Sequence, residues 1–338
     1  MIGGRVLGAG PSATAAAFAT AVALGLLGGL SQARAEDQDG GSSIVRTCPT
    51  EPGPSVRIYR APWLRGGGIA GDGWDGPGLG SATLFWHVEG ASPDFSAGQR
   101  TALIAGLQAW ASVVDVDFVE LPVPNQERAV DFDFLVGDHS VVEPAEAGDP
   151  DCPFDGANGT LAHAGFPPGV SSACVDPMPE TFAGNVHFDE AETWEQDTGS
   201  GAAFSLTLIA CHEIGHAIGL VHDNSGGGDV MRPTFGPGDG FVGLSEDDIA
   251  NAQSGYAVGP GAVVTLETTG VWVDSDAAGP ELGTSAQPFN TVVEGTAGVP
   301  PLSTGIVVHI DAGNYPGGLL VTQNMVLRAE NGVVTIGN

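Results

Sequence analysis

The sequence predicts an α+β domain followed by a small all-β unit. Three observations support this fold class. Apolar residues recur at helical spacing in three segments, and segments with strand-like alternation surround the first of them. The 53 glycines and 24 prolines favour turns and loops over long helices. After Tyr256 the chain changes to short runs of Val, Ile and Leu separated by Gly and Asn, a texture typical of all-β structure.

Residues 1–35 indicate a secretory signal peptide. Arg5 supplies a positive start, residues 15–30 are almost all small or apolar, and residues 33–35 (Ala-Arg-Ala) form an A-x-A-like cleavage site. A membrane anchor is the alternative, because the apolar run is nearly long enough to span a bilayer. We expect the signal to be removed, so that the mature protein is secreted into the extracellular space and keeps no membrane span.

The charge balance restricts the partners of the chain. There are 41 acidic residues against 10 basic ones, for a formal net charge of -31 at pH 7. Such a surface repels phosphates, which argues against nucleic acids and anionic membranes as partners. The 42% content of hydrophobic residues is enough for a packed core, and the length allows about two domains.

The elements follow in order after a polar, flexible lead-in at residues 36–55. Strands are predicted at 81–88, 115–121 and 129–136, and helices at 96–113, 202–220 and 244–256. Ser96 is the expected N-cap of the first helix, and Ser245 with Asp248 makes a cap-like start of the third. The irregular stretch at 137–194 is too long for a structureless loop in a compact domain, so we expect bound ions to order it.

The second predicted helix carries the residues of a metal site in the sequence HEIGHAIGLVH. His212 and His216 are four residues apart, so both imidazoles project from one helical face and suit a single zinc ion. Glu213 lies beside the first of them, where a carboxylate can accept a proton from a water that the metal activates. Gly219 tolerates a positive φ and permits a sharp bend that returns His222 as a third ligand. Three nitrogen ligands with one open position indicate a hydrolytic zinc rather than a structural one.

The pattern continues with Met231, nine residues after His222. HExxHxxGxxH followed by such a methionine resembles the metzincins, a group of zinc metalloproteases. This resemblance implies a zincin-type fold, with a twisted, mostly parallel sheet and three helices. It also implies a Met-turn in which Met231 packs beneath the zinc without binding it.

Two upstream segments narrow the resemblance to the matrixins, the matrix metalloproteinase family. They are DGANGTLAHA at 155–164 and NVHFDEAE at 185–192. The adamalysins share an aspartate after the third histidine, here Asp223, but lack these two segments. Resemblance to the matrixins implies a second, structural zinc and a calcium ion, and the imidazoles and hard oxygen ligands suit these ions. A solvated acidic loop with two incidental histidines is the alternative.

The resemblance also assigns the ligands of these ions. It implies that the structural zinc is bound by His139, Asp151, His163 and His187. It implies that the calcium is held by the residues Asp155, Gly156, Asn158, Thr160, Asp189 and Glu192. An insertion at 141–151 separates His139 from the rest of the family motif, so Asp149 and Asp151 both stay open as the acidic ligand.

The same resemblance implies protein or peptide substrates. Leu161 and Ala162 match an edge strand against which a peptide lies as an added antiparallel strand. Leu208 matches the base of the pocket for the side chain after the scissile bond, and Pro233 and Phe235 match the pocket wall. An apolar residue is therefore the expected preference at that position.

Four cysteines lie in the mature part: Cys48, Cys152, Cys174 and Cys211. They allow three pairings, between which the sequence does not choose. Because Cys152 and Cys174 bracket one loop-rich stretch, we favour a disulfide between them, which leaves Cys48 and Cys211 paired with each other or free. A Cys48 thiolate that blocks the metal is a further alternative.

We assign residues 56–257 to the matrixin-like domain and residues 258–338 to the all-β unit. Strands are expected in AVVTLETT, GIVVHIDAG, LLVTQNMVLRA and GVVTIGN. This segment resembles the opening rungs of pectin-lyase-like right-handed β-helices. A solenoid needs several stacked rungs and a cap, so the unit either stacks on the protease or is truncated. Glycan or cell-surface contact and a passive stabilising role are both open for it.

Together these features predict a secreted zinc-dependent endopeptidase in which Glu213 acts as the general base. The expected cofactors are a catalytic zinc, a structural zinc and calcium. The alternative is a surface adhesin or glycan-binding protein whose metal sites only stabilise the fold. Glu213 speaks against this alternative, because a purely structural metal site has no use for that carboxylate.

Overall fold

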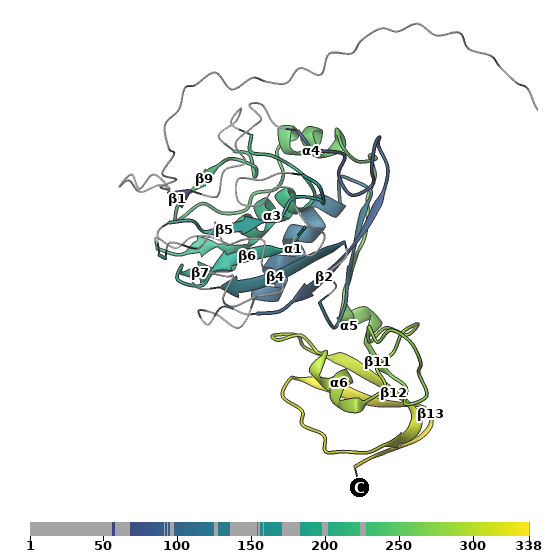
Figure 1. Ribbon diagram of the computed structural model, residues 1–338. Coiled ribbons are helices and arrows are strands. Elements are labelled where there is room, and N and C mark those ends of the chain that lie inside the picture. Colours follow the sequence, from purple (N-terminus) through teal and green to yellow (C-terminus); the bar gives the residue numbers. More distant parts are fainter. Residues whose placement is uncertain are drawn as a thin grey trace, which may run out of the picture. The chain divides into compact units, whose positions relative to one another are not determined.

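The structure of the protein is a computed structural model (Figure 1). It describes residues 56–57, 68–90, 92, 94, 98–124, 128–135, 154, 156–157, 159–170, 183–197, 202–223 and 228–337. All of them belong to one compact unit, Pro52–Asn338. Among these residues no helix combines the length and the apolar character needed to cross a bilayer.

Several predictions fall on residues outside the described ranges. They are the signal peptide, the lead-in and the residues Cys48, His139, Asp149, Asp151, Cys152, Asp155, Asn158 and Cys174. Cys211 is described, and it carries a free thiol in the hydrophobic core. Of the two outcomes left open for this cysteine, the structure therefore has the unpaired one.

A six-stranded sheet organises the first part of the chain, in the order β10-β3-β2-β4-β6-β5. Its strands are β2 (Ala82–Val88), β3 (Val116–Glu120), β4 (Ala129–Leu135), β5 (Ala162–Ala164), β6 (Val186–Asp189) and β10 (Val263–Val264). All neighbours pair in parallel except β5, which is antiparallel to β6. The mostly parallel sheet predicted from the metzincin resemblance is thus confirmed, and β5 is an edge strand of the described sheet.

Three helices of this part confirm the helical spacing of the sequence: α1 (Gln99–Ala111), α3 (Leu206–Ala217) and α4 (Glu246–Gln253). Figure 1 shows α1 and α3 together over the sheet. They approach closely at Gly106, where a Cβ would lie 2.9 Å from the Ile214 Cδ1 atom and 3.0 Å from the Cys211 backbone nitrogen. The Trp110 indole N–H also donates to the Cys211 carbonyl at 2.7 Å. Close backbone approach thus fixes α3, the predicted metal-binding helix, against α1.

The helix starts differ in how well the sequence predicts them. Ser245 and Asp248 form the expected capping box at the start of α4, with both reciprocal hydrogen bonds present. The prediction that Ser96 caps α1 is wrong, because Gly98 is the N-cap and has a left-handed φ of 100°. Glycine adopts this φ without a Cβ clash, and the Gln99 side chain exchanges two hydrogen bonds with the Ser92 backbone, which fix the start of the helix.

Two short pairings complete the first part. β1 (Val56–Arg57) pairs antiparallel with β9 (Thr234–Phe235), and β7 (Trp194–Glu195) pairs parallel with β8 (Phe204–Ser205). The β8 strand leads directly into α3, whose N-cap Ser205 accepts a hydrogen bond from the Leu208 N–H at 3.2 Å.

The C-terminal part has its own hydrophobic core beneath a three-stranded parallel sheet. Its elements are α5 (Leu266–Thr269), β11 (Val271–Val273), α6 (Val292–Ala297), β12 (Ile306–Tyr315) and β13 (Met325–Ile336). The strands predicted at GIVVHIDAG and GVVTIGN are confirmed, and the second is the end of β13. LLVTQNMVLRA is a strand only from Met325 onward.

The segment AVVTLETT is mostly not the predicted strand. Only Val263 and Val264 are extended, and they pair with β3 of the first sheet rather than with the C-terminal sheet. The chain then turns into α5, because the Leu266 N–H donates to the buried Glu120 carboxylate at 2.8 Å. The β-branched residues that favour a strand here are overruled by this contact with a distant residue.

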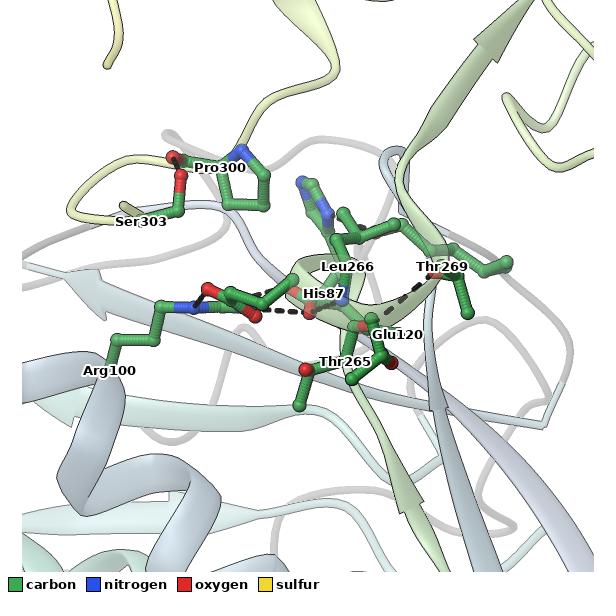
Figure 2. Close-up of polar contacts among 11 residues, drawn as sticks. His87, Arg100, Glu120, Thr265, Leu266, Thr269, Pro300 and Ser303 are labelled. Atoms are coloured by element: carbon green, nitrogen blue, oxygen red, sulfur yellow. Dashed lines mark hydrogen bonds and ion pairs between the residues drawn. The ribbon is translucent and has the colours of Figure 1, made fainter. Parts of the chain in front are cut away.

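A buried ionic cluster joins α5 to the first sheet and to α1 (Figure 2). Both terminal nitrogens of Arg100 donate to the Glu120 carboxylate at 2.5 Å, and Nε and Nη2 donate to Glu267 at 2.7 Å. Arg100 and Glu120 are only 7% and 2% exposed. Burial raises the pKa of Glu120, and the Arg100 guanidinium opposes that shift. Every charge of this junction therefore has a partner in the chain itself.

Candidate metal centre

The first two candidate ligands lie on α3, which is buried along its whole length. His212 and His216 are one turn apart, and their rings lie edge to face with centroids 4.6 Å apart. The His212 ring also meets the Phe235 ring, and the His216 ring meets the Phe166 ring, at centroid distances of 5.2 and 5.4 Å. Aromatic packing thus limits the rotation of both imidazoles.

The chain leaves α3 through the glycine bend that the sequence predicts. Gly219 has a φ of +103°, a conformation that other residues rarely adopt. Its N–H donates to the His216 carbonyl, and the Leu220 N–H donates to the Gly215 carbonyl, both at 2.8 Å. These two bonds form a Schellman motif, which reverses the chain and directs it toward His222.

Two aromatic side chains that the sequence analysis did not identify hold this bend. The Trp74 indole N–H donates to the Ala217 carbonyl at 2.7 Å, and the Tyr256 hydroxyl donates to the Ile218 carbonyl at 2.8 Å. They satisfy carbonyls that a helix end leaves without partners. The Ala70 N–H donates to the Gly219 carbonyl at 2.7 Å, so a third distant segment fixes the start of the His222 arm.

The three imidazoles converge on one point. The His222 Nε2 atom lies 3.1 Å from His216 Nε2 and 3.2 Å from His212 Nε2. The opposite nitrogens of the two helical histidines point at carbonyls: His212 Nδ1 donates to Val230 and His216 Nδ1 to Leu220, both at 2.6 Å. These bonds select the tautomer that leaves the Nε2 lone pairs free for a metal.

The donor set fits zinc. Tetrahedral zinc with Zn–N bonds of about 2.0–2.1 Å needs nitrogens roughly 3.4 Å apart. The separations of 3.1 and 3.2 Å are close to that value, and the three histidines are at most 4% exposed. Burial lowers the pKa of His212 well below its usual range, and His216 and His222 lower it further; burial also lowers the pKa of His216 to about 4. The imidazoles of His212 and His216 are therefore neutral at pH 7, which is the form that binds a metal.

Glu213 is a further buried ionisable residue at this centre. Its side chain is 0% exposed, and neither carboxyl oxygen has a hydrogen-bond partner among the described residues. Burial raises the pKa of Glu213 well above its usual range. A carboxyl group without a protein partner, one residue from a metal ligand, is suited to exchange a proton with a bound molecule.

Met231 lies against α3 between the two helical ligands. A Cβ at Gly215 would lie 2.4 Å from the Met231 Sδ atom, so the glycine makes room for the methionine. The Asp248 carboxylate accepts the N–H groups of Val230 and Met231 at 2.9 and 3.1 Å, and the Met231 carbonyl accepts the Asp223 N–H at 2.8 Å. The turn thus connects the start of α4 with the His222 arm.

Comparison with known proteins agrees with this geometry. The family profile described as matrixin matches residues 79–257, more than half of the chain. This protein belongs to the matrixin family. The family inferred from the sequence motifs is confirmed, whereas the resemblance of the C-terminal segment to β-helices lies outside the matched residues.

Several matrix metalloproteinases are similar to this matrixin over the same part of the chain. Matrix metalloproteinase-20 of Homo sapiens is 36% identical over 177 residues, which are 52% of the chain and 31% of the relative. Interstitial collagenase of Oryctolagus cuniculus is 32% identical over 174 residues, 51% of the chain and 31% of the relative. Matrix metalloproteinase-25 of Homo sapiens is 34% identical over 188 residues, 53% and 29% respectively. The matched region thus spans about a third of the length of these relatives.

The two described histidines of the predicted structural zinc site are adjacent in this matrixin. His163 on β5 and His187 on β6 face each other in the strand register, with His163 Nε2 and His187 Nδ1 3.1 Å apart. The Phe154 ring stacks on the His163 ring at 4.8 Å. The other two predicted ligands lie outside the described residues, so the full ligand set remains a prediction.

One hydrogen bond joins the two segments of the predicted calcium site. The Gly159 N–H donates to the Glu192 carboxylate at 3.2 Å, which brings the loop before β5 next to the segment after β6. Glu192 and Asp189 are 3% and 0% exposed. Gly156 has a φ of +83°, and Thr160 lies in the same loop.

The predicted substrate-contact residues lie at the start of β5, on α3 and in or just before β9. Leu161 and Ala162 are fully buried at the start of the edge strand β5. Leu208 is buried in the first turn of α3. Pro233 is half-buried and precedes β9, where Phe235 packs on His212 and beneath the Arg232 guanidinium at 4.3 Å.

Proposed function

We propose that this matrixin is a secreted zinc-dependent endopeptidase that cleaves protein or peptide substrates. One observation carries the proposal: three buried imidazoles with nitrogens 3.1 and 3.2 Å apart lie next to Glu213, a buried carboxyl group with no partner among the described residues. A structural metal site closes its coordination with protein ligands, whereas a catalytic one keeps a position open. Membership of the matrixin family supports the same chemistry. Secretion is proposed from residues 1–35.

The roles of the residues follow from their contacts. His212, His216 and His222 hold the zinc, and the Val230 and Leu220 carbonyls fix the first two rings in the binding tautomer. The zinc, when bound, supplies a Lewis acid that polarises the scissile carbonyl and activates water. Glu213 takes a proton at a carboxylate oxygen and passes it to the leaving amine. Its raised pKa matches this double role, because a carboxyl group that titrates nearer neutrality both accepts and donates.

The remaining ions stabilise the segments around this centre. We assign the structural zinc to His163 and His187 together with His139 and Asp151, and calcium to the loop at 155–160 together with Asp189 and Glu192. The distance of 3.1 Å between the two ring nitrogens and the Gly159–Glu192 hydrogen bond support these assignments. Both ions would order the stretch before α3.

Substrate binding is assigned to the edge strand and to β9. A peptide that pairs with β5 adds a strand to the described sheet next to α3. Leu208 and Phe235 then offer apolar contacts for the side chain after the scissile bond. We therefore propose an apolar preference at that position.

Cleavage of a quenched peptide with an apolar residue after the scissile bond tests the function. We expect the mature chain to cleave it, a zinc chelator to abolish cleavage, and added zinc to restore it. Glu213→Ala should keep one equivalent of zinc in the histidine centre but lose about 10²–10⁴-fold in kcat/KM. Glu246→Ala, at an exposed glutamate on α4, is the matched control and should behave as the wild type.

Two outcomes would contradict the proposal. Full activity of the Glu213→Ala variant would exclude this residue as the general base. Absence of cleavage by zinc-loaded wild-type protein, over a library of peptides with different apolar residues, would favour a binding protein with purely structural metals.

A further inference from the structure

Three aspartates form an acidic cluster beside the histidine centre: Asp223, Asp229 and Asp247. One carboxylate oxygen of each lies within 4.8 Å of those of the other two. The residues come from three segments, namely the arm that follows His222, the turn before Met231 and the first turn of α4. None of them is among the residues assigned above to zinc or calcium.

Asp229 makes this cluster more than a group of surface acids. Its side chain is 3% exposed, and its Oδ2 atom is buried without a hydrogen-bond partner among the described residues. Asp223 is 2% exposed as well. Burial of a carboxylate is costly unless a cation or hydrogen-bond donors compensate the charge.

Arg232, the described cation closest to Asp229 in the sequence, does not pair with the Asp229 carboxylate. Arg232 directs Nη1 to the Asp229 backbone carbonyl at 3.4 Å and Nη2 to the Asp239 carboxylate at 2.9 Å. Its guanidinium lies over the Phe235 ring. The cluster therefore concentrates negative charge around a buried oxygen that no described side chain neutralises.

We propose that Asp223, Asp229 and Asp247 bind a calcium ion. Three carboxylates offer only hard oxygen donors, which suit calcium and magnesium rather than zinc. Calcium accepts six to eight ligands in irregular geometry, whereas magnesium requires a near-ideal octahedron and keeps most of its waters. Ligands from three separate segments, with Asp247 exposed to solvent, match the irregular and partly hydrated geometry of calcium.

The ion would connect the segments that position the histidine centre. Asp223 directly follows His222, Asp229 is two residues before Met231, and Asp247 precedes the aspartate that binds the Met231 N–H. The Asn251 amide already donates to Asp223 from α4 at 2.9 Å. Calcium therefore ties the third imidazole, the methionine turn and α4 together, and this role does not depend on whether the centre hydrolyses peptides.

Calcium counting with the zinc-loaded full chain tests this site. Equilibrium dialysis against calcium, followed by metal analysis, should give one equivalent fewer for Asp229→Asn and for Asp247→Asn than for wild type. Asp239→Asn is the matched control, since Asp239 is 43% exposed and has Arg232 and the Gly236 N–H as partners, so its calcium count should not change. Asp189→Asn separates this site from the other calcium assignment, because it should retain the ion at the acidic cluster.

Thermal unfolding provides a second measurement, because the unfolding temperature of Asp229→Asn relative to wild type should depend on calcium. Without calcium, Asp229→Asn should unfold at the same temperature as wild type or higher, because the substitution removes an uncompensated charge. With calcium in excess, wild type should gain several degrees and the variant should gain less. Equal calcium counts and equal calcium-induced shifts in wild type and both variants would overturn the site. If Asp229→Asn does not fold, the exposed Asp247→Asn decides.

Discussion

The histidine centre and the Arg100 junction both bury ionisable side chains, but they compensate the cost of burial in different ways. At the junction, Arg100 reaches both carboxylates, and Glu120 also accepts the Leu266 N–H. At the histidine centre, both oxygens of Glu213 are buried without a described partner. Burial of charge is thus compensated within the chain at the Arg100 junction, whereas at the histidine centre it leaves a carboxyl group that a ligand can complete.

This difference distinguishes buried ionisable groups that stabilise the fold from those that serve a function. A buried group whose partners all come from the chain contributes to stability and specificity of packing. A buried group without chain partners indicates that a molecule or ion from solution completes it. By this criterion Asp229 resembles Glu213 and not Glu120.

Removal of the junction cation should have the largest effect. Arg100→Met keeps the apolar stem but leaves the buried Glu120 carboxylate uncompensated, so the free energy of unfolding should fall by about 3–5 kcal/mol. Chemical denaturation of the zinc-loaded protein measures this loss. Glu267→Gln is the control: its side chain is 33% exposed, and loss of this outer pair should cost less than about 1 kcal/mol.

The double variant Arg100→Met with Glu120→Leu sharpens this test. It removes both charges and should recover most of the stability that the single variant loses. A single variant as stable as wild type would show that the junction does not depend on charge compensation.

Low pH should destabilise the zinc-free histidine centre over a defined pH range. Burial lowers the pKa of His216 from 6.5 to about 4, so the folded zinc-free protein resists a proton that the unfolded chain accepts. Stability is therefore unaffected above pH 6.5 and falls as the pH decreases toward 4, by about 3 kcal/mol in total. Denaturation in a chelator at a series of pH values measures this decline. His216→Gln should show a shallower decline, and identical slopes would refute the assignment.

Much of the fold is predictable from local periodicity. The spacing of apolar residues correctly predicts the helices that contain Trp110, Ile214 and Ile249 and the strand that contains Leu84. The segment at 265–269 fails, because its β-branched residues favour a strand while the distant Glu120 carboxylate draws the Leu266 N–H into a helical turn. Local propensity loses wherever a long-range hydrogen bond supplies more stabilisation.

The histidine centre is predictable for a similar reason. His212, His216 and His222 lie on one helix and its glycine bend, so sequence spacing alone determines how they meet. The residues that hold the bend are not predictable in this way, since Trp74 reaches α3 from 143 positions away. Sequence spacing does not predict the acidic cluster either, because Asp229 and Asp247 approach each other only when the methionine turn packs on α4.

Crowding at the methionine turn should have a moderate effect on stability. The Cβ of Gly215→Ala would lie 2.4 Å from the Met231 Sδ atom and 3.1 Å from the Trp110 ring, so the methionine must shift. Overpacking costs about 1–3 kcal/mol, and the better helix propensity of alanine returns about 1 kcal/mol. We expect a net loss of about 1–2 kcal/mol by denaturation, together with weaker zinc binding. Gly318→Ala, where no atom lies within 4 Å of the added Cβ, should be neutral.

The smallest effect is expected at Glu213, and its sign distinguishes the two kinds of buried charge. Glu213→Gln replaces an uncompensated carboxyl group by a neutral amide of the same shape, so the zinc-free variant should be more stable than wild type. The gain should be about 1 kcal/mol or less, because the amide also lacks partners at this site and the raised pKa of Glu213 already favours its neutral form. Glu120→Gln should instead lose stability, since Arg100 then lacks a buried anionic partner. If both substitutions shift the free energy of unfolding in the same direction, partner status does not distinguish functional from structural charge in this protein.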